Sequence, residues 1–211
     1  ESPQAALYEA WYDATVAGLF ADELGEDLAA GYAARRSLAA KAVDNLIQSS
    51  DSAWCDDVRT AEAETCETLL GRTLQQALAS MGDRQGTATV AKWRWDRVNA
   101  ARFPHRPLDA VPLLKRFFSR AVPRGGDAFT VTPVMPLDDD IFVSSYRQII
   151  DLAGPDSSRF VIPMGQSGHL WSDGYANLLD RWNRAEYLPM RFSRLAVDDA
   201  AKATLVLEPR K

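Results

Sequence analysis

The stretch SYRQIIDLAGPDSSRFVIPMGQSG, residues 145–168, is the part of the sequence that most clearly predicts a fold. It includes most of an expected strand at residues 141–152 and all of a second one at residues 159–163, both rich in residue types that favour strands. The run GPDSS at residues 154–158 supplies turn residues between them. Consecutive strands with a short connection pair in the antiparallel direction. We therefore expect an antiparallel hairpin here.

The flanking sequence predicts further short elements. Residues 128–134 and 204–207 are rich in Val, Thr and Leu and are expected to form strands. Apolar residues recur on one face of a helix over residues 173–184. The prolines between residues 82 and 126 exclude one long helix, because each removes a donor and restricts the residue before it. That region is expected to contain loops and a short helix around residues 111–120.

The first ninety residues are predicted to form a helical layer. Apolar residues recur close to the 3.6-residue period in segments that start at Leu7 and at Val58, and residues 28–47 between them are rich in Ala, Leu, Lys and Arg. We expect three packed helices over residues 1–90. A loop-rich linker and a strand-rich part follow over residues 91–211. Helices followed by antiparallel strands define an α+β fold.

Composition excludes several classes of partner. The chain has 211 residues, is 46% hydrophobic and can bury a sizeable core. Its formal net charge of -5 argues against nucleic acid, because phosphate binding requires clustered Lys and Arg. The longest apolar runs are far shorter than the ~20 residues that span a bilayer, so no membrane span is expected.

One motif resembles a catalytic motif but does not have its spacing. GQSGH at residues 165–169 places a serine between glycines, as in a nucleophile elbow. That motif needs one residue between the serine and the second glycine, whereas Gly168 follows Ser167 directly. A structural glycine turn is the favoured interpretation. His105 and His169 are the only histidines and have no metal-ligand spacing, which argues against zinc.

Three other segments have alternative interpretations. The acidic run at residues 138–140 could bind calcium but lacks the alternating ligands and glycine of a calcium loop, so a solvated turn is favoured. RGGD at residues 124–127 lacks the spacing and the Lys of a phosphate loop. Trp93 and Trp95 could form a stacking surface, but such aromatic residues more often anchor a loop to a core.

Cys55 and Cys66 are the only cysteines. On one unbroken helix they would be ~16 Å apart, at ~1.5 Å rise per residue, which exceeds the span of a disulfide. A bridge therefore requires the chain to turn between them. Spacing alone does not separate a disulfide from two free thiols.

Five groups of residues between positions 93 and 190 carry a family resemblance. They are WRWDRVN (93–99) with FPH (103–105) and PL (107–108); GGD (125–127) with TV (130–131); SYRQIIDL (145–152); PMGQSG (163–168); and Tyr175, Leu179 and Trp182 with YLPM (187–190). In this order they resemble the C-terminal portion of the large (beta) subunit of the penicillin acylase family of N-terminal-nucleophile amidohydrolases. The first ninety residues resemble the family only loosely. Asp96, Asn99 and Met164 depart from its usual pattern.

The resemblance implies one part of a larger enzyme, built as a four-layered αββα sandwich. In this family a secreted precursor is cut into two subunits, and the serine that begins the large subunit is both nucleophile and, through its α-amino group, base. This chain begins with Glu1, and Ser2 is not terminal. The resemblance therefore implies no catalytic residue in this chain, and a further cleavage before Glu1.

The implied activity is cleavage of the amide bond of N-acyl compounds, such as beta-lactams, acyl-homoserine lactones or lipopeptide side chains. The implied partners are a companion small subunit, the N-terminal part of the large subunit and a small-molecule N-acyl substrate. The implied location is periplasmic or secreted. No cofactor is expected from this chain, and any structural calcium would be held mainly by the missing part. The alternative is a non-catalytic binding or assembly module with Trp93 and Trp95 facing a partner.

The resemblance also assigns structural roles. An exported protein favours a Cys55–Cys66 disulfide. The turn residues are expected to supply positive φ angles or close backbone approaches. Arg147 is expected to be buried against a carboxylate, Asp127 or Asp151, since an unpaired buried charge is costly. The turn residues are Gly125, Gly126, Asp127, Gly165, Gln166, Ser167 and Gly168.

Overall fold

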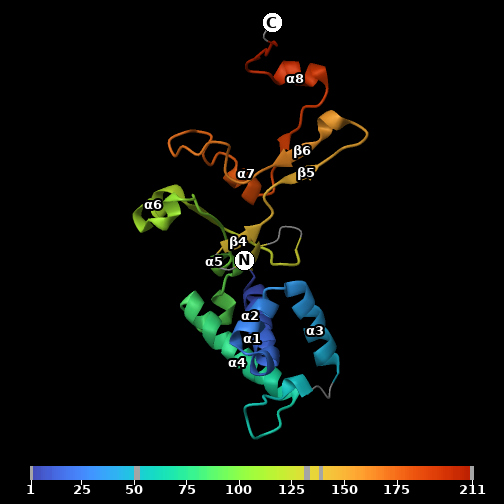
Figure 1. Cartoon of the computed structure of the whole chain (residues 1–211), viewed down its shortest axis with the longest axis vertical. Coiled ribbons are helices and arrows are strands. Elements are labelled where there is room, and N and C mark those ends of the chain that lie inside the picture. Colours follow the sequence, from blue (N-terminus) through green and yellow to red (C-terminus); the bar gives the residue numbers. More distant parts are fainter. Residues whose placement is uncertain (1, 50–52, 131–133, 138–139, 210–211) are drawn as a thin grey trace. The chain divides into compact units, whose positions relative to one another are not determined.

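The computed structural model describes residues 2–49, 53–130, 134–137 and 140–209 (Figure 1). The chain divides into two compact units, each made from two stretches of sequence. Residues 91–211, which the sequence predicts as one part, are divided between both units. Unit 1 consists of Glu1–Arg102 and Ser119–Val143, and unit 2 of Phe103–Phe118 and Ser144–Lys211.

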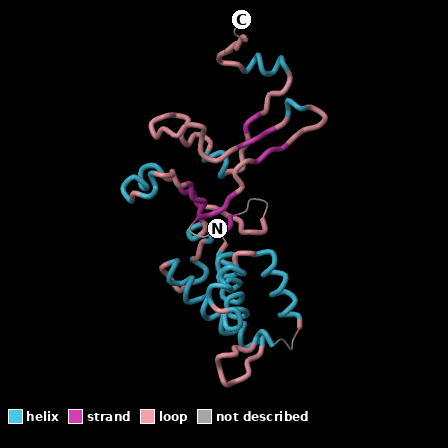
Figure 2. Tube along the Cα trace, viewed as in Figure 1, coloured by secondary structure: helices cyan, strands magenta, loops and turns pink. Residues whose placement is uncertain are grey.

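In the described part of unit 1, four helices provide most of the structure (Figure 2). Ser2 caps the first of them, because its Oγ accepts a hydrogen bond of 3.2 Å from the Ala5 N–H. The longest two, α1 and α4, pack against each other. The helices are α1 (Pro3–Leu24), α2 (Glu26–Ala33), α3 (Arg36–Gln48) and α4 (Cys66–Gln85). Their apolar core includes Val16, Leu19, Phe20, Val43, Cys55 and Leu69.

The prediction of three helices is wrong in two places. Residues 28–47 form two helices, because the chain turns at Ala34 and Arg35 before α3 begins. The segment expected to start at Val58 becomes helical only at Cys66. Thr65 fixes that start, since its Oγ1 accepts a hydrogen bond of 3.2 Å from the Thr68 N–H.

Unit 1 also contains short elements that the sequence did not predict. A single helical turn, α5 (Trp95–Val98), leads into the strand β1 (Ala100–Phe103), of which all but the last residue belong to unit 1. This strand pairs with β2 (Arg120–Pro123). A second pair is antiparallel and joins β3 (Val134–Leu137) to β4 (Asp140–Val143). The strand expected at residues 128–134 overlaps β3 only at its last residue; residues 131–133 lie outside the described part. Unit 1 also contains the 3₁₀ turns η1 (Ala53–Cys55) and η2 (Val90–Lys92), and unit 2 contains η3 (Leu108–Ala110).

Unit 2 is built on a small antiparallel sheet of order β5-β6-β7 (Figure 1). The predicted pairing around residues 154–158 is confirmed, since Arg147 lies opposite Val161 and Ile149 opposite Arg159. The long strand expected at residues 141–152 is wrong, because it is split into β4 and β5. The elements are α6 (Pro112–Phe118), β5 (Arg147–Ile149), η4 (Pro155–Ser157), β6 (Arg159–Val161), α7 (Leu179–Asn183), β7 (Leu188–Pro189) and α8 (Arg194–Ala200).

Two more predictions in unit 2 need correction. The helix expected over residues 173–184 begins only at Leu179. Hydrogen bonds to a preceding turn hold the chain before it: the Leu178 N–H donates to the Met164 carbonyl, and the Ser167 N–H to the Gly174 carbonyl. The strand expected at residues 204–207 is absent, and that segment is irregular. The short helix expected around residues 111–120 is confirmed as α6.

The elements agree with an α+β fold. Among the described residues, no helix combines the length and the apolar character needed to cross a membrane.

Candidate functional site

A cavity of about 190 Å³ lies inside unit 1. Side chains of α1, α3, α4 and α5 and the turn after β2 surround it. Its wall combines apolar groups with three carboxylates and two guanidinium groups. The lining residues are Glu9, Ala10, Asp13, Arg36, Met81, Arg84, Trp95, Val98, Asn99, Asp127 and Ala128.

Glu9 is the buried acid of this cavity, with 6% of its surface exposed. Arg36 Nη2 donates to Glu9 Oε2 at 2.5 Å, and Nη1 donates to Asp13 Oδ1 at 2.5 Å. The Arg36 guanidinium also lies 4.6 Å from the centroid of the Tyr12 ring. This ion pair joins α1 to the start of α3 and gives a physical reason for the chain to turn before Arg36.

Burial raises the pKa of Glu9 to about 6. Desolvation is the largest cause, because a carboxylate removed from water loses its hydration. Arg36 acts in the opposite direction, and the carboxylates of Asp127 and Asp13 raise the pKa further. No sequence motif predicts the pairing of Glu9 with Arg36. The available signal was the position of Glu9, three residues after Ala6 and therefore on the buried face of α1, where a charged residue needs a partner.

We expect this acid to make stability depend on pH. The folded pKa of about 6 exceeds the ordinary value of 4.5, so the folded state holds the proton more tightly, and stability falls as pH rises from 4.5 to 6. At ~1.4 kcal/mol per pKa unit, the fall is about 2 kcal/mol. Between pH 4.5 and 6, the urea unfolding midpoint of Glu9→Gln should change less with pH than that of the unchanged protein. Equal slopes would contradict this origin.

The glycine turn at residues 125–127 is held by side chains from α5 and the residue after it. Trp95 Nε1 donates to the Gly126 carbonyl at 2.7 Å, and Asn99 Nδ2 donates to the same oxygen at 2.9 Å. Gly126 has a φ of +84°, as expected for this turn. Gly125 has no positive φ, and a Cβ there would meet no atom within 4 Å. Asp127 closes the turn by accepting from the Phe129 N–H at 2.7 Å.

The paired tryptophans are structural. Trp93 is 1% exposed, and its Nε1 donates to the Thr87 carbonyl at 2.7 Å. Trp95 is half-buried and holds the Gly126 carbonyl. The alternative in which both tryptophans face a partner does not hold for Trp93, because a buried indole offers no docking surface.

The second glycine turn lies in unit 2 and needs a close backbone approach. A Cβ added at Gly165 would overlap the Gly174 carbonyl oxygen and lie 2.6 Å from Asn177 Oδ1. Gln166 is an exposed residue of this turn. Ser167 Oγ accepts a hydrogen bond of 3.1 Å from the backbone N–H of His169, while the His169 ring lies 5.5 Å from that of Trp171. The hydroxyl of Ser167 thus stabilises the turn. Gly168 has no positive φ, and its carbonyl lies 3.1 Å from His105 Nε2.

The expected carboxylate partner of Arg147 is not present among the described residues. Its Nη2 donates to the Trp182 carbonyl, and its guanidinium lies 4.8 Å from the centroid of the Trp182 ring. Desolvation lowers the pKa of Arg147, while Tyr187 raises it. Asp151 instead accepts from the N–H groups of Ala153 and Gly154. A ring face and a carbonyl oxygen therefore replace the predicted carboxylate.

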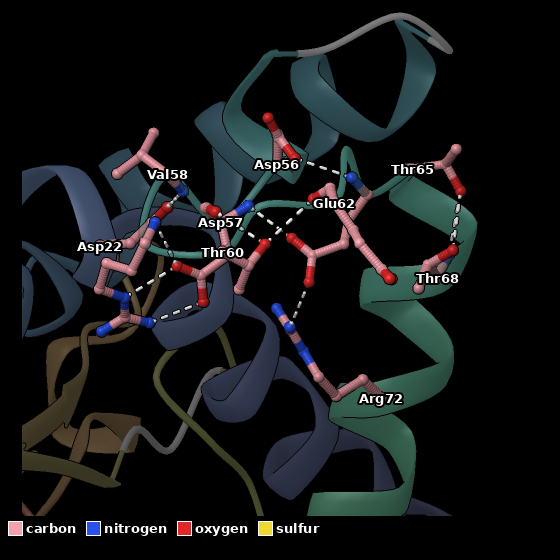
Figure 3. A network of polar contacts seen from close by, with 11 residues as sticks. Asp22, Asp56, Asp57, Val58, Thr60, Glu62, Thr65, Thr68 and Arg72 are labelled. Carbon is pink, nitrogen blue, oxygen red and sulfur yellow. Dashed lines mark hydrogen bonds and ion pairs between the residues drawn. The ribbon is translucent and has the colours of Figure 1, made fainter.

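Cys55 and Cys66 form a disulfide, as the resemblance implies, with their Cα atoms 4.9 Å apart. The chain turns between them, as a bridge requires. Figure 3 shows the polar network of this loop. Asp56 Oδ1 accepts from the Glu64 N–H at 2.7 Å, and Glu64 Oε2 accepts from the Asp57 N–H at 2.7 Å. Arg72 on α4 contacts Glu64 at 3.0 Å.

The same loop is tied to α1. The Val58 N–H donates to Asp22 Oδ2 at 2.9 Å (Figure 3). Hydrogen bonds from Arg59 lower the pKa of Asp57 to about 2. The loop therefore contacts both long helices through charged groups in addition to the disulfide.

Within the described ranges, no group of three or more His, Cys, Asp or Glu side chains could hold a metal ion. Two residues of the acidic run, 138 and 139, lie outside those ranges. The expectation that any structural calcium is held mainly by the part of the enzyme outside this chain stays a prediction.

The fold and sites define a scaffold with two tightly held glycine turns and a bridged loop. The sequence model of the penicillin amidase family matches residues 1–199. The chain belongs to the penicillin amidase family.

Curated relatives agree with this family. The acyl-homoserine lactone acylase QuiP of Pseudomonas fluorescens is 32% identical over 227 residues, which cover 100% of this chain and 26% of the relative. QuiP of Pseudomonas aeruginosa is 29% identical, over 93% of this chain and 26% of the relative. The chain thus spans about a quarter of the length of these relatives.

A solved structure supports the fold. The thermostable penicillin G acylase from Alcaligenes faecalis matches all of this chain and 39% of its own chain, with a TM-score of 0.53 and 16% identity. At this identity the likeness concerns the fold, and it agrees with the predicted α+β class.

Proposed function

We propose that this chain is the C-terminal portion of the large subunit of an amidohydrolase that cleaves N-acyl compounds. The family match over residues 1–199 carries the proposal. The relatives' name favours acyl-homoserine lactones over beta-lactams and lipopeptide side chains as substrates. Because the chain spans about a quarter of those relatives, the remaining parts come from the companion small subunit and the N-terminal part of the large subunit.

In the proposed mechanism, the serine that begins the companion chain attacks the amide carbonyl. Its α-amino group takes the hydroxyl proton and transfers it to the leaving amine, and an acyl-enzyme forms. Hydrogen-bond donors of the companion chain stabilise the oxyanion of the tetrahedral intermediate. Water then attacks the ester and releases the carboxylic acid and the serine.

The role of this chain is to hold backbone and helices in place. Ser167, the serine with the most suggestive surroundings in the sequence, bonds the backbone of its own turn. Ser2 caps α1. Hydrogen bonds between segments distant in sequence are made by the side chains of Arg36, Trp95, Asn99 and Arg147. We infer that this chain by itself is inactive.

A periplasmic or secreted location is part of the proposal. The Cys55–Cys66 disulfide supports it, because disulfides persist in oxidising compartments and are rare in the cytosol.

Native mass spectrometry of the purified enzyme, followed by N-terminal sequencing of each released chain, tests the proposal. We expect companion chains, one of which begins with serine. Replacing that serine with alanine should abolish release of homoserine lactone from an N-acyl-homoserine lactone, whereas Ser167→Ala should leave the rate unchanged. A homogeneous 23.3 kDa species without a companion would instead favour an independent module.

A further inference from the structure

The segment after α8 combines a strand-forming sequence with an irregular, exposed backbone. Leu205, Val206 and Leu207 are 82%, 71% and 84% exposed. Within the described residues, the backbone of 202–209 makes no hydrogen bond. Aliphatic side chains and unpaired backbone groups are therefore presented together, a combination that proteins usually pair or cover.

The sequence of this segment indicates which of its faces need to be buried. Successive side chains of a strand point to opposite faces. Leu205 and Leu207 would therefore lie on one face and Val206 on the other. Strands that are apolar on both faces are typically buried between two layers. Pro209 has no N–H to donate and would end the pairing there.

The sheet of unit 2 offers little to pair with. Its two edge strands are β5 and β7, with three and two residues. Ile149 on β5 is itself exposed, so this sheet does not supply an apolar layer on each side. About three quarters of the length of the curated relatives lies outside this chain.

We propose that residues 204–207 add as a strand to the edge of a sheet formed by the part of the large subunit outside this chain. This inference rests on the proposed function, since it requires that companion. The added strand satisfies its backbone groups in the sheet and places Leu205 and Leu207 against one layer and Val206 against the other. The C-terminal segment thereby attaches this chain to the companion.

Hydrogen exchange measured by mass spectrometry on the intact complex tests the strand directly. Peptides that cover residues 203–208 should exchange at least about 100-fold more slowly than a synthetic peptide of the same sequence, because hydrogen-bonded strand amides exchange only on opening. Exchange at the peptide's rate, in a complex shown to be intact by native mass spectrometry, would overturn the proposal.

Substitutions test which faces are covered. Leu205→Asp and Val206→Asp each place a charge on a different face, and each should reduce the amount of intact complex about tenfold. Leu195→Asp on α8 is the matched control, because Leu195 is also 82% exposed. It should leave the amount of complex unchanged. Equal effects of all three substitutions, or none from the first two, would contradict a strand buried on both faces.

The outcomes separate this inference from the proposed function. If the complex hydrolyses N-acyl substrate while residues 203–208 exchange freely, the strand proposal is contradicted and the proposed function is not. If residues 203–208 are protected in a complex without amidase activity, the proposed function is contradicted and the strand proposal is not. Protection that requires two copies of this chain, and is lost on dilution, would show self-association and overturn the proposal.

Discussion

Replacing both Cys55 and Cys66 with serine is expected to destabilise the chain by about 3 kcal/mol, the chain-entropy value for a loop of this length. The bridge closes the loop that follows η1 at the point where α4 begins, and Cys55 lies in the core of unit 1. Without it, the unfolded chain gains freedom and the loop is held only by its polar network. Urea unfolding without reductant should show a lower midpoint for the double variant.

Reductant provides the control for this prediction. The unchanged protein should lose about the same stability when reduced, and the double variant should not respond. Two free thiols in the mass spectrum of the unreduced protein, or equal midpoints for both proteins, would contradict a stabilising bridge. Two free thiols would also remove the support that the disulfide gives to an exported location.

Replacing Gly165 with alanine should have a comparable effect on unit 2. The added methyl group would overlap the Gly174 carbonyl oxygen and press on the Asn177 side chain. Since the first of these is backbone, the turn must move, and the hydrogen bond from the Ser167 N–H to Gly174 is lost. We expect a loss of about 3 kcal/mol, the upper part of the usual range for overpacking. The measurement is the midpoint of urea unfolding, monitored by tryptophan fluorescence.

Gly168 is the matched control, since it belongs to the same motif. A Cβ there would meet no atom within 4 Å, and its φ is not positive. Gly168→Ala should therefore change stability by less than about 0.5 kcal/mol. Equal losses from both substitutions would show that the effect at Gly165 comes from replacing a glycine as such and not from its close approach to the Gly174 carbonyl.

The two turns illustrate how far a sequence motif can predict geometry. The sequence indicated that glycines at 125–126 and 165–168 serve backbone shape. Only the structure shows that Gly126 needs its positive φ, that Gly165 needs the absence of a Cβ, and that Gly125 and Gly168 have neither need. The difference depends on atoms from distant segments, such as the Gly174 carbonyl, which a motif does not contain.

The charged residues illustrate a second limit. Arg147 was expected to meet a carboxylate, because a buried charge needs a partner. The structure supplies a carbonyl oxygen and a ring face from Trp182, 35 residues away. Conversely, the Glu9–Arg36 pair spans 27 residues and was not predicted, because neither residue has a local signature.

The sequence by itself determined the family resemblance, the α+β class, the antiparallel pairing of β5 with β6 and the requirement for a turn between the cysteines. These depend on residue types and short spacings, which local physical chemistry decides. The tertiary structure decided where α3, α4 and α7 begin, which partners Glu9 and Arg147 have, and that residues 204–207 remain unpaired within the described chain. Each of these depends on groups brought together from distant positions, because a helix start or a buried charge is stabilised by whatever the folded chain places beside it.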